Sequence, residues 1–325
     1  IATGSEVAVP DNVVIDEKDI LSSTGALSLS RVPDKLVVVG AGYIGLEMGS
    51  VWSRLGSKVT VIEYADRIIP NMDNEISNQF QKILIKQGID FKLSTAFKKI
   101  TKKNNKLYIS IETKEGQTSE ISCDKVLISI GRKPYTFGLN LDGAGVQTDS
   151  KGFIITKDNF QTSAENIFAI GDCKLGPMLA HKASEEGTAL AEIIVGQVGH
   201  VNFDTIPSVV YTAPEVAAVG KTEEELKSLG LKYKVGKFPF TANAKAKVMH
   251  ETLGFVKILS DANSDKVLGV HMIGPDVGNM IAELALAMEF GASSEDIART
   301  CHAHPTLTES IKEAALNVEK RAIHI

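Results

Sequence analysis

Hydrophobic and polar positions along the first 130 residues form blocks that predict a parallel sheet flanked by helices. Three short runs are apolar and rich in β-branched residues, as expected for strands buried on both faces: residues 35–39, 58–62 and 126–130. Residues 43–55 and 72–87 have the spacing of helices, and each stretch is followed by a glycine that ends it. The pattern predicts an α/β domain.

Other segments of the same half predict strands outside that sheet. Residues 91–97 predict one strand, and residues 107–113 and 119–123 predict a hairpin that turns around Gly116. Residues 131–134 have the sequence Gly-Arg-Lys-Pro, which breaks the strand before them.

The last third of the chain changes to an α+β pattern. Thr222 and Glu225 form a capping box that begins a short helix. Residues 277–290 predict an amphipathic helix rich in Ala, Leu and Met, and residues 293–300 predict a second helix before the C-terminal one. Three antiparallel strands are expected between the short helix and residue 277: residues 233–240, 254–260 and 267–273.

Composition narrows the class of protein further. The 325 residues are 43% hydrophobic and 23% charged, with a formal charge of -5, which argues against a nucleic-acid-binding surface. No apolar run approaches the ~20 residues of a membrane helix, so we expect no membrane partner. Cys123, Cys173 and Cys301 are far apart in sequence, which encodes neither a local dithiol nor a metal site. Cys123 and Cys173 are expected to be buried and reduced.

A glycine-rich turn follows the first predicted strand. Gly40, Gly42 and Gly45 form a G-x-G-x-x-G between a strand and a helix, and Glu63 ends the next strand 18 positions after Gly45. This is the context of a dinucleotide fingerprint: tight turn, close approach of the pyrophosphate, and close helix–strand packing. Glu63 would accept hydrogen bonds from the adenosine ribose and repel a 2′-phosphate. The sequence therefore predicts NAD rather than NADP.

Two other residues of this half are candidates for the same site. Glu47 is either a first-turn carboxylate that interacts with the helix dipole or a contact to the nicotinamide half, and the sequence leaves both open. Gly131 is placed near the cofactor by topology, because ligands of open α/β sheets bind beyond the carboxyl ends of strands.

A second cofactor signal follows residue 160. An apolar strand is expected to lead into Gly171-Asp172. Asp172 either accepts a hydrogen bond from a sugar or polyol hydroxyl or is a turn residue at a strand end. The next helix begins around residues 178–181, and its free N–H groups could face an electron-rich ring. His181 itself is expected to be a helix-end or interface residue rather than a catalyst.

Near the C-terminus, His304 precedes a proline and lies five residues before Glu309, in the first turn of the last predicted helix. A carboxylate that accepts from one ring nitrogen orients an imidazole and raises its basicity, which leaves the other nitrogen to move protons. The alternative is a surface histidine before an ordinary helix start. Nothing in the spacing gives His302 a carboxylate partner.

Together these segments resemble the dihydrolipoyl dehydrogenases, a branch of the pyridine-nucleotide–disulfide oxidoreductases. The resemblance runs over all 325 residues and rests on seven motifs: V-V-V-G-A-G-Y-I-G-L-E, I-G-R-K-P, N-I-F-A-I-G-D, G-P-M-L-A-H-K-A, P-S-V-V-Y-T-A-P-E-V, K-F-P-F-T-A-N and H-A-H-P-T-L-T-E. The presence of Glu63 separates the chain from NADP-using relatives.

The resemblance implies roles for individual residues. The NAD site would be lined by Gly40, Ala41, Gly42, Tyr43, Ile44, Gly45, Leu46, Glu47, Glu63, Phe97 and Gly131. FAD would be contacted by Thr3, Gly4, Ser5, Asp172, Met178, Leu179, Ala180 and His181. His304 would be the acid–base group and Glu309 its orienting partner, serving the flavin site of the other subunit of a homodimer.

The resemblance also implies a domain order. A Rossmann-like NAD-binding domain would span residues 1–134, with residues 1–5 as the end of an FAD domain. A central FAD-contacting segment (residues 135–202) and an α+β dimerisation domain (residues 203–325) would follow. The family's first FAD fingerprint and its C-x-x-x-x-C disulfide have no counterpart here. We therefore expect a fragment of a larger enzyme, inactive by itself.

The intact protein would oxidise dihydrolipoamide to lipoamide as the E3 component of 2-oxoacid dehydrogenase complexes, with electrons passing through a disulfide and FAD to NAD. Its partners would be lipoyl domains and the E2 or E3-binding subunits, and its compartment the mitochondrial matrix. Two alternatives stay open: another disulfide reductase of the same group, and a non-catalytic module for NAD binding and dimerisation.

Overall fold

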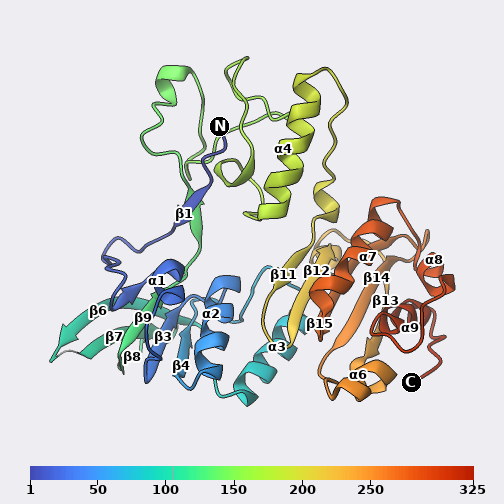
Figure 1. Ribbon diagram of the computed structural model, residues 1–325, viewed down its shortest axis with the longest axis horizontal. Coiled ribbons are helices and arrows are strands. Elements are labelled where there is room, and N and C mark those ends of the chain that lie inside the picture. The colour runs from blue at the N-terminus through green and yellow to red at the C-terminus, as the bar shows by residue number, and fades with distance from the viewer. Residues whose placement is uncertain (105) are drawn as a thin grey trace. The chain divides into compact units, whose positions relative to one another are not determined.

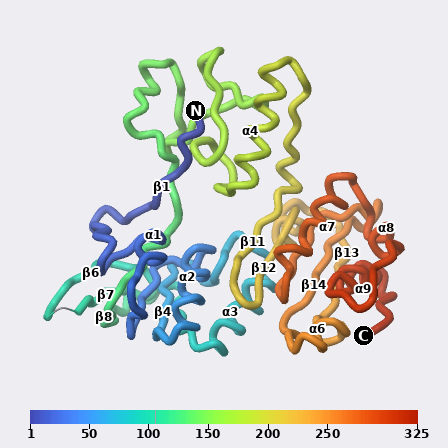
Figure 2. Tube along the Cα trace, in the orientation of Figure 1, coloured from blue at the N-terminus to red at the C-terminus, as the bar shows by residue number. Residues whose placement is uncertain are grey.

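The computed structural model describes residues 1–104 and 106–325, which divide into two compact units. The small unit contains residues 1–11 and 130–203, and the large unit contains residues 12–129 and 204–325. Figure 1 labels most of the helices and strands of both units, and Figure 2 follows the path of the chain through them.

The large unit begins with the predicted parallel sheet. Its five strands lie in the order β2 (Ile20–Leu21), β9 (Lys125–Ile128), β3 (Lys35–Val39), β4 (Lys58–Ile62) and β5 (Asp90–Lys92). All neighbouring pairs are parallel. The predicted helices are α2 (Tyr43–Arg54) and α3 (Asn74–Lys86), and a short α1 (Ser23–Leu27) was not predicted. The Rossmann-like α/β prediction is confirmed.

The single strand predicted at residues 91–97 is wrong. The chain turns at Ser94, which has a φ of 49°, so β5 ends at Lys92 and a new strand begins at Thr95. This new strand, β6 (Thr95–Lys103), joins β7 (Lys106–Thr113) and β8 (Thr118–Cys123) in a separate antiparallel sheet. The predicted hairpin is confirmed, and Gly116 adopts a φ of 83° between β7 and β8.

The rest of the large unit is an antiparallel sheet with helices. The strand order is β11 (Ser208–Val210), β12 (Glu215–Gly220), β15 (Val267–Gly274), β14 (Phe255–Asp261) and β13 (Tyr233–Pro239). The helices are α5 (Glu223–Ser228), α6 (Ala244–Met249), α7 (Val277–Glu289), α8 (Ser294–Arg299) and α9 (Glu309–Val318). The predicted elements are confirmed, including the capping box of α5. The strands β11 and β12 and the helix α6 were not predicted.

Both faces of this antiparallel sheet are buried, as the alternation along β12 shows. Val216 packs into the same hydrophobic cluster as α2 and α3, whereas the next residue, Ala217, packs into the cluster under α7 and α9. Since the first cluster includes residues of both sheets, the two sheets of the large unit share a hydrophobic core.

The small unit has little regular structure. Its strand β1 (Ser5–Val7) pairs with β10 (Arg132–Pro134), so the predicted break at residues 131–134 ends one strand and begins another. The predicted strand leading into Gly171-Asp172 is wrong: that segment forms an isolated bridge between Gln161 and Phe168 and then a 3₁₀ turn at Gly171–Cys173. The predicted helix start is confirmed, since α4 (Ala180–Ile194) begins there.

Cys123 and Cys173 are buried and Cys301 is exposed, and all three are free thiols. In the part of the chain that the structure describes, no helix combines the length and apolar character needed to cross a bilayer. The same residues contain no group of three or more His, Cys, Asp or Glu side chains placed to hold a metal ion.

Candidate functional site

The glycine-rich turn between β3 and α2 is shaped by close contacts. Gly40 has a φ of 106° and donates its N–H to the carbonyl of Ile62 at 2.8 Å, which brings the turn against the end of β4. A Cβ on Gly45 would lie 2.1 Å from the Gly40 carbonyl oxygen, so only glycine fits there. The helix therefore packs directly on the strand, as the fingerprint predicts.

Gly42 is the N-cap of α2 and makes no side-chain capping hydrogen bond. A Cβ at Gly42 would meet no protein atom within 4 Å, so the space in front of it is open. Free N–H groups at the start of a 12-residue helix beside open space fit the pyrophosphate of a dinucleotide.

Glu63 follows the last residue of β4 and is half-buried. One carboxylate oxygen accepts the N–H of Ala41 at 2.7 Å, and the other accepts the N–H of Ala65 at 2.8 Å. The carboxylate is thus fixed in orientation and keeps further acceptor positions for ribose hydroxyls.

Glu47 and Tyr43 connect α2 to the antiparallel sheet. Glu47 accepts the N–H of Tyr211 at 2.8 Å, and the Tyr43 hydroxyl hydrogen-bonds the side chain of Ser208. Burial raises the pKa of Glu47 and also that of Tyr43. Because α2 begins at Tyr43, Glu47 lies beyond its first turn, which rules out the first-turn interaction with the helix dipole.

The remaining NAD candidates have different surroundings. Leu46 is fully buried in the core of the sheet, and Ala41 is buried beside it. Ile44 is half-buried, and Phe97 packs against the cluster that contains Val39 and Ile62. Gly131 belongs to the small unit, where it has a φ of 128° and accepts the N–H of Ala8 at 3.0 Å.

The small unit brings together several of the residues assigned to FAD. The Ser5 hydroxyl donates to Asp172 at 2.5 Å, and the Arg132 guanidinium donates to the same hydroxyl at 2.7 Å. Thr3 donates to the carbonyl of Tyr135 at 2.6 Å, and Gly4 accepts the N–H of that residue at 2.9 Å. Asp172 is therefore oriented by Ser5 of β1, the strand that pairs with β10. Sequence reasoning missed Arg132, whose partner is 127 positions away.

A buried charge cluster fixes the turn that carries Asp172. Glu186, on α4, accepts from Lys174 at 2.9 Å and from Lys182 at 3.1 Å, and its other oxygen accepts the N–H of Gly171 at 2.6 Å. The side chains of Lys182 and Glu186 are fully buried. Burial lowers the pKa of Lys182, although Glu186 opposes that effect. Sequence reasoning also missed this cluster.

The start of α4 is close in sequence to this cluster, because Lys182 and Glu186 lie in the first half of the helix. Its N-cap, Leu179, makes no side-chain capping hydrogen bond to the start of this 15-residue helix. Met178 and Leu179 are half-buried, whereas Ala180 and His181 are exposed. This arrangement is compatible with an electron-rich ligand at the helix start.

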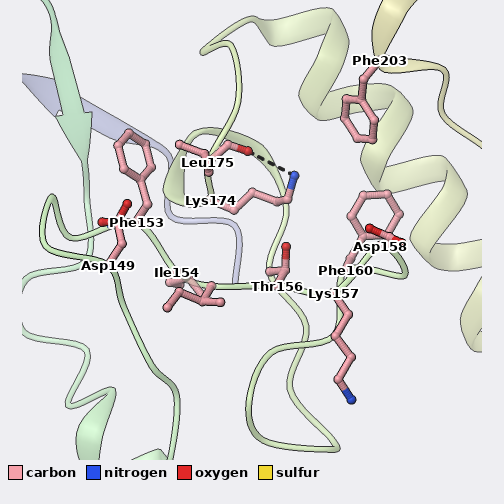
Figure 3. A pocket seen from close by; sticks show the side chains of 11 residues that line it. Asp149, Phe153, Ile154, Thr156, Lys157, Asp158, Phe160, Lys174, Leu175 and Phe203 are labelled. Carbon is pink, nitrogen blue, oxygen red and sulfur yellow. Dashed lines mark hydrogen bonds between the residues drawn. The ribbon is translucent and has the colours of Figure 1, made fainter.

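A hollow of about 300 Å³ is lined by Lys174 and Leu175, which follow the turn that carries Asp172 (Figure 3). The ammonium of Lys174 lies 5.2 Å from the ring centre of Phe203 and 5.7 Å from that of Phe160. Figure 3 shows the Lys174 side chain extending toward these aromatic residues. The hollow was not predicted from the sequence.

His304 and Glu309 form the predicted pair. Nδ1 of His304 lies 2.9 Å from one oxygen of Glu309, whose other oxygen accepts the N–H of Thr306 at 2.8 Å. Partial burial would raise the pKa of Glu309, but the bonds from Thr306 and His304 outweigh it and lower that pKa. The His304 side chain is 69% exposed. The pair therefore presents an oriented imidazole at the surface of the large unit.

The prediction that His302 lacks a carboxylate partner is wrong. Nε2 of His302 lies 2.9 Å from Glu283, which is on α7, and Nδ1 lies 3.0 Å from the carbonyl of Thr300. The His302 side chain is only 4% exposed. The two residues are 19 positions apart, in elements whose packing the local sequence pattern does not reveal.

Two family models match the chain. The model described as "Pyridine nucleotide-disulphide oxidoreductase" matches residues 1–187, and that of the dimerisation domain of the same family matches residues 206–315. The mitochondrial dihydrolipoyl dehydrogenase of Pisum sativum is 54% identical over the whole chain, and the chain spans 65% of that relative's length. Dihydrolipoyl dehydrogenase 3 of Pseudomonas putida is 53% identical, with 70% of its length covered.

A solved structure, LpdA from Mycobacterium tuberculosis, superposes with a TM-score of 0.89 at 27% identity, covering 97% of this chain and 68% of that one. Two adjacent models of one family thus account for most of the chain, and sequence and structure agree. The chain therefore belongs to the pyridine nucleotide-disulphide oxidoreductase family.

Proposed function

We propose that this chain is part of a dihydrolipoyl dehydrogenase, in which dihydrolipoamide and NAD⁺ are converted to lipoamide, NADH and a proton. The observation that carries the proposal is the His304–Glu309 pair at 2.9 Å, in a chain that also has the glycine-rich turn and the fixed carboxylate of Glu63. The high identity to two dihydrolipoyl dehydrogenases supports the choice of substrate.

His304 would take the thiol proton of the substrate at Nε2, because Glu309 holds the other ring nitrogen. Glu309 would stabilise the imidazolium that forms, and its low pKa keeps it ionised while it does so. This is the acid–base half of the reaction, in which the dithiol becomes nucleophilic.

The electron-transfer half requires two cofactors. Bound FAD supplies a route for two electrons between a disulfide and NAD. We infer that NAD is held by the turn at Gly40–Gly45 and by Glu63, with Glu47, Phe97 and Gly131 as further candidates. FAD would contact Asp172, residues 3–5 and residues 178–181. These assignments rest on the open space at Gly42 and on the ordered Asp172 carboxylate.

The redox disulfide would come from outside the 325 residues, whose three cysteines are free. We infer that the isolated chain is inactive for this reason. The proposed domain order is a nucleotide-binding part up to residue 134, an FAD-contacting segment over residues 135–202 and an interface domain from residue 203. The match of residues 206–315 to a dimerisation model supports a homodimer.

Assembly and compartment are inferred from the relatives alone. We propose that lipoyl domains are the substrates, that E2 or E3-binding subunits are the docking partners, and that the protein works in the mitochondrial matrix. The Pisum sativum relative is named as mitochondrial, whereas the Pseudomonas putida relative makes a bacterial cytoplasm the competing compartment. Cell fractionation with an antibody to residues 203–325 distinguishes the two.

The test uses the intact protein that contains this chain. His304→Gln should lower turnover of dihydrolipoamide by about 10²–10⁴-fold and leave the affinity for NAD unchanged, and Glu309→Gln should cost less because the base remains. The matched control is His324→Gln, since His324 pairs with Glu313 at 2.8 Å and is 66% exposed. Equal losses for His304→Gln and His324→Gln would contradict the assignment.

A substrate panel tests the alternatives. A related disulfide reductase would turn over another disulfide faster than lipoamide, while a non-catalytic module would bind NAD and dimerise without turnover of any of them. Light scattering tests the dimer: a stable monomer at micromolar concentration would remove the second subunit that His304 is proposed to serve.

A further inference from the structure

His302 stands between two hydrogen-bond acceptors. Nδ1 lies 3.0 Å from the carbonyl oxygen of Thr300, and Nε2 lies 2.9 Å from a carboxylate oxygen of Glu283. A neutral imidazole carries only one N–H, so it can donate to only one of them. Both contacts are hydrogen bonds only when the ring is a doubly protonated imidazolium. The side chain is 4% exposed, so water offers the second nitrogen little alternative.

The charges that face the ring support this state. Glu283, on α7, is the main cause of a raised pKa of His302, and the carbonyl of Thr300 adds to it. Burial and Lys312, on α9, act in the opposite direction. Lys312 donates to the same Thr300 carbonyl at 2.8 Å, so a second cation shares that acceptor. The pKa of His302 is raised on balance.

These contacts join three elements at one end of a loop. Thr300 is the C-cap of α8, Glu283 is on α7, and His302 is two residues before His304. At the other end of the loop, the N–H of Thr306 donates to Glu309 at 2.8 Å, and its carbonyl accepts from Asn243 at 3.0 Å. The loop that carries His304 is thus anchored on both sides.

We propose that His302 is a positioning residue: its imidazolium ties the loop that carries His304 to helix α7 through Glu283 and to the end of α8 through Thr300. The catalytic part of this inference rests on the proposed function. Loss of the proton removes one of the two hydrogen bonds and loosens the loop. His302→Gln reproduces that state, because an uncharged amide has a single nitrogen and cannot donate in both directions.

The sign of the pH dependence follows from the raised pKa. The His302–Glu283 contact contributes stability fully below the ordinary imidazole value of 6.5, and this contribution is lost as the pH rises through the folded value. The loop should therefore be most ordered below the raised pKa of His302 and become more mobile as the pH rises through it.

The first experiment measures protonation directly. The intact protein is labelled with ¹⁵N in its histidine rings, and His302→Gln assigns the signal of His302. At pH 6, below the ordinary value of 6.5, we expect both ring nitrogens of His302 to carry protons, and we expect the ring to titrate above that value. A single ring proton at pH 6, or titration at or below 6.5, would overturn the proposal. This readout does not depend on which substrate the enzyme uses.

The second experiment measures position. His302→Gln and Glu283→Gln should each lower kcat about 10–100-fold, the range expected from a misplacement of about 1 Å, with the KM for NAD unchanged. The double variant should be no worse than the more severe single one, because the two residues act as a unit. Deprotonation of His302 should lower the activity of the wild-type enzyme as the pH rises. This fall should be absent in His302→Gln.

His324→Gln is the matched control, since it removes another histidine–glutamate contact of the same module. Thermal unfolding of each variant separates loss of fold from loss of position, and Glu283→Gln is the milder change because Glu283 is 37% exposed. If His302→Gln behaves as His324→Gln does, the proposal is wrong. If the wild-type protein does not oxidise dihydrolipoamide, the proposed function fails. The measurement of ring protonation would still test the contacts of His302 with Glu283 and Thr300.

Discussion

The ammonium of Lys257 lies 3.0 Å from each carboxylate oxygen of Asp73, and both side chains are buried. Asp73 is the N-cap of α3, beside the parallel sheet, whereas Lys257 is on β14 of the antiparallel sheet. Lys257 also contacts Glu223, on α5, at 2.6 Å. One ion cluster therefore joins the parallel-sheet part to the antiparallel-sheet part of the large unit.

Removal of the cation should be costly. Lys257→Met leaves the Asp73 carboxylate buried without its partner, and we expect a loss of about 3–5 kcal/mol in the free energy of unfolding. Urea denaturation measures this loss. Lys234→Met is the matched control, because Lys234 pairs with Glu319 at the surface, where such pairs contribute about 0–1 kcal/mol. A loss below 1 kcal/mol for Lys257→Met would show that the site accommodates the unpaired carboxylate.

Acid should weaken the same cluster. Burial would raise the pKa of Glu223, but hydrogen bonds from Lys227, Lys257 and Tyr233 lower it to about 2. A depressed pKa contributes stability above the unfolded value of 4.5 that is lost as the pH falls toward 2. Urea midpoints measured from pH 5 to pH 3 should therefore decline, and Glu223→Gln should reduce the slope. An unchanged slope would exclude Glu223 as a source of the acid sensitivity.

The two glycines of the turn should respond differently to alanine. Gly45→Ala places a Cβ 2.1 Å from the Gly40 carbonyl oxygen, so both stability and NAD affinity should fall. Gly42→Ala meets no protein atom within 4 Å, so the fold should remain, while the methyl group occupies the space assigned to the pyrophosphate. Thermal unfolding and NAD calorimetry on both variants test this contrast. If Gly42→Ala binds NAD with unchanged affinity, the pyrophosphate does not occupy the space in front of Gly42.

Glu63 should make NAD the preferred nucleotide. Its carboxylate would accept from ribose hydroxyls and repel the additional phosphate of NADP, so the chain should bind NAD more tightly by at least about tenfold, the equivalent of 1.4 kcal/mol. Calorimetric titration of both nucleotides measures the ratio, and Glu63→Gln should reduce it. Equal affinities in the wild-type chain would contradict the assignment.

The isolated chain should not retain flavin. Asp172, residues 3–5 and the start of α4 supply only part of the proposed FAD site, so FAD should separate from the 325 residues on gel filtration. Absorbance at the flavin band in the protein peak measures retention. A stoichiometric yellow fragment would show that these residues hold FAD by themselves.

Sequence reasoning succeeded where structure is determined locally. The β3–α2–β4 unit was predicted because two apolar β-branched runs flank a glycine-rich turn, and the capping box at Thr222 and Glu225 identified α5. It failed at residues 91–97, where Ser94 adopts a left-handed conformation that apolar periodicity does not encode. It also failed before Gly171, where an apolar run of which only Ala169 is fully buried does not form a strand.

In the candidate site too, contacts between residues close in sequence were predicted and tertiary contacts were not. His304 and Glu309 were found together because they are five residues apart. Glu283, Arg132 and Glu186 were missed because tertiary packing brings them to His302, Ser5 and Lys174. Such contacts join elements whose approach depends on the assembled core, so spacing along the chain does not reveal them.

The hydrogen bond from Ala41 to Glu63 has a consequence for redesign of cofactor choice. Replacing Glu63 to admit NADP would also remove the acceptor that steadies the glycine-rich turn, so a substitution chosen for charge alone would gain selectivity and lose affinity for both nucleotides. A successful switch would need a new acceptor for the Ala41 N–H, supplied by a neighbouring side chain, together with a cation for the phosphate.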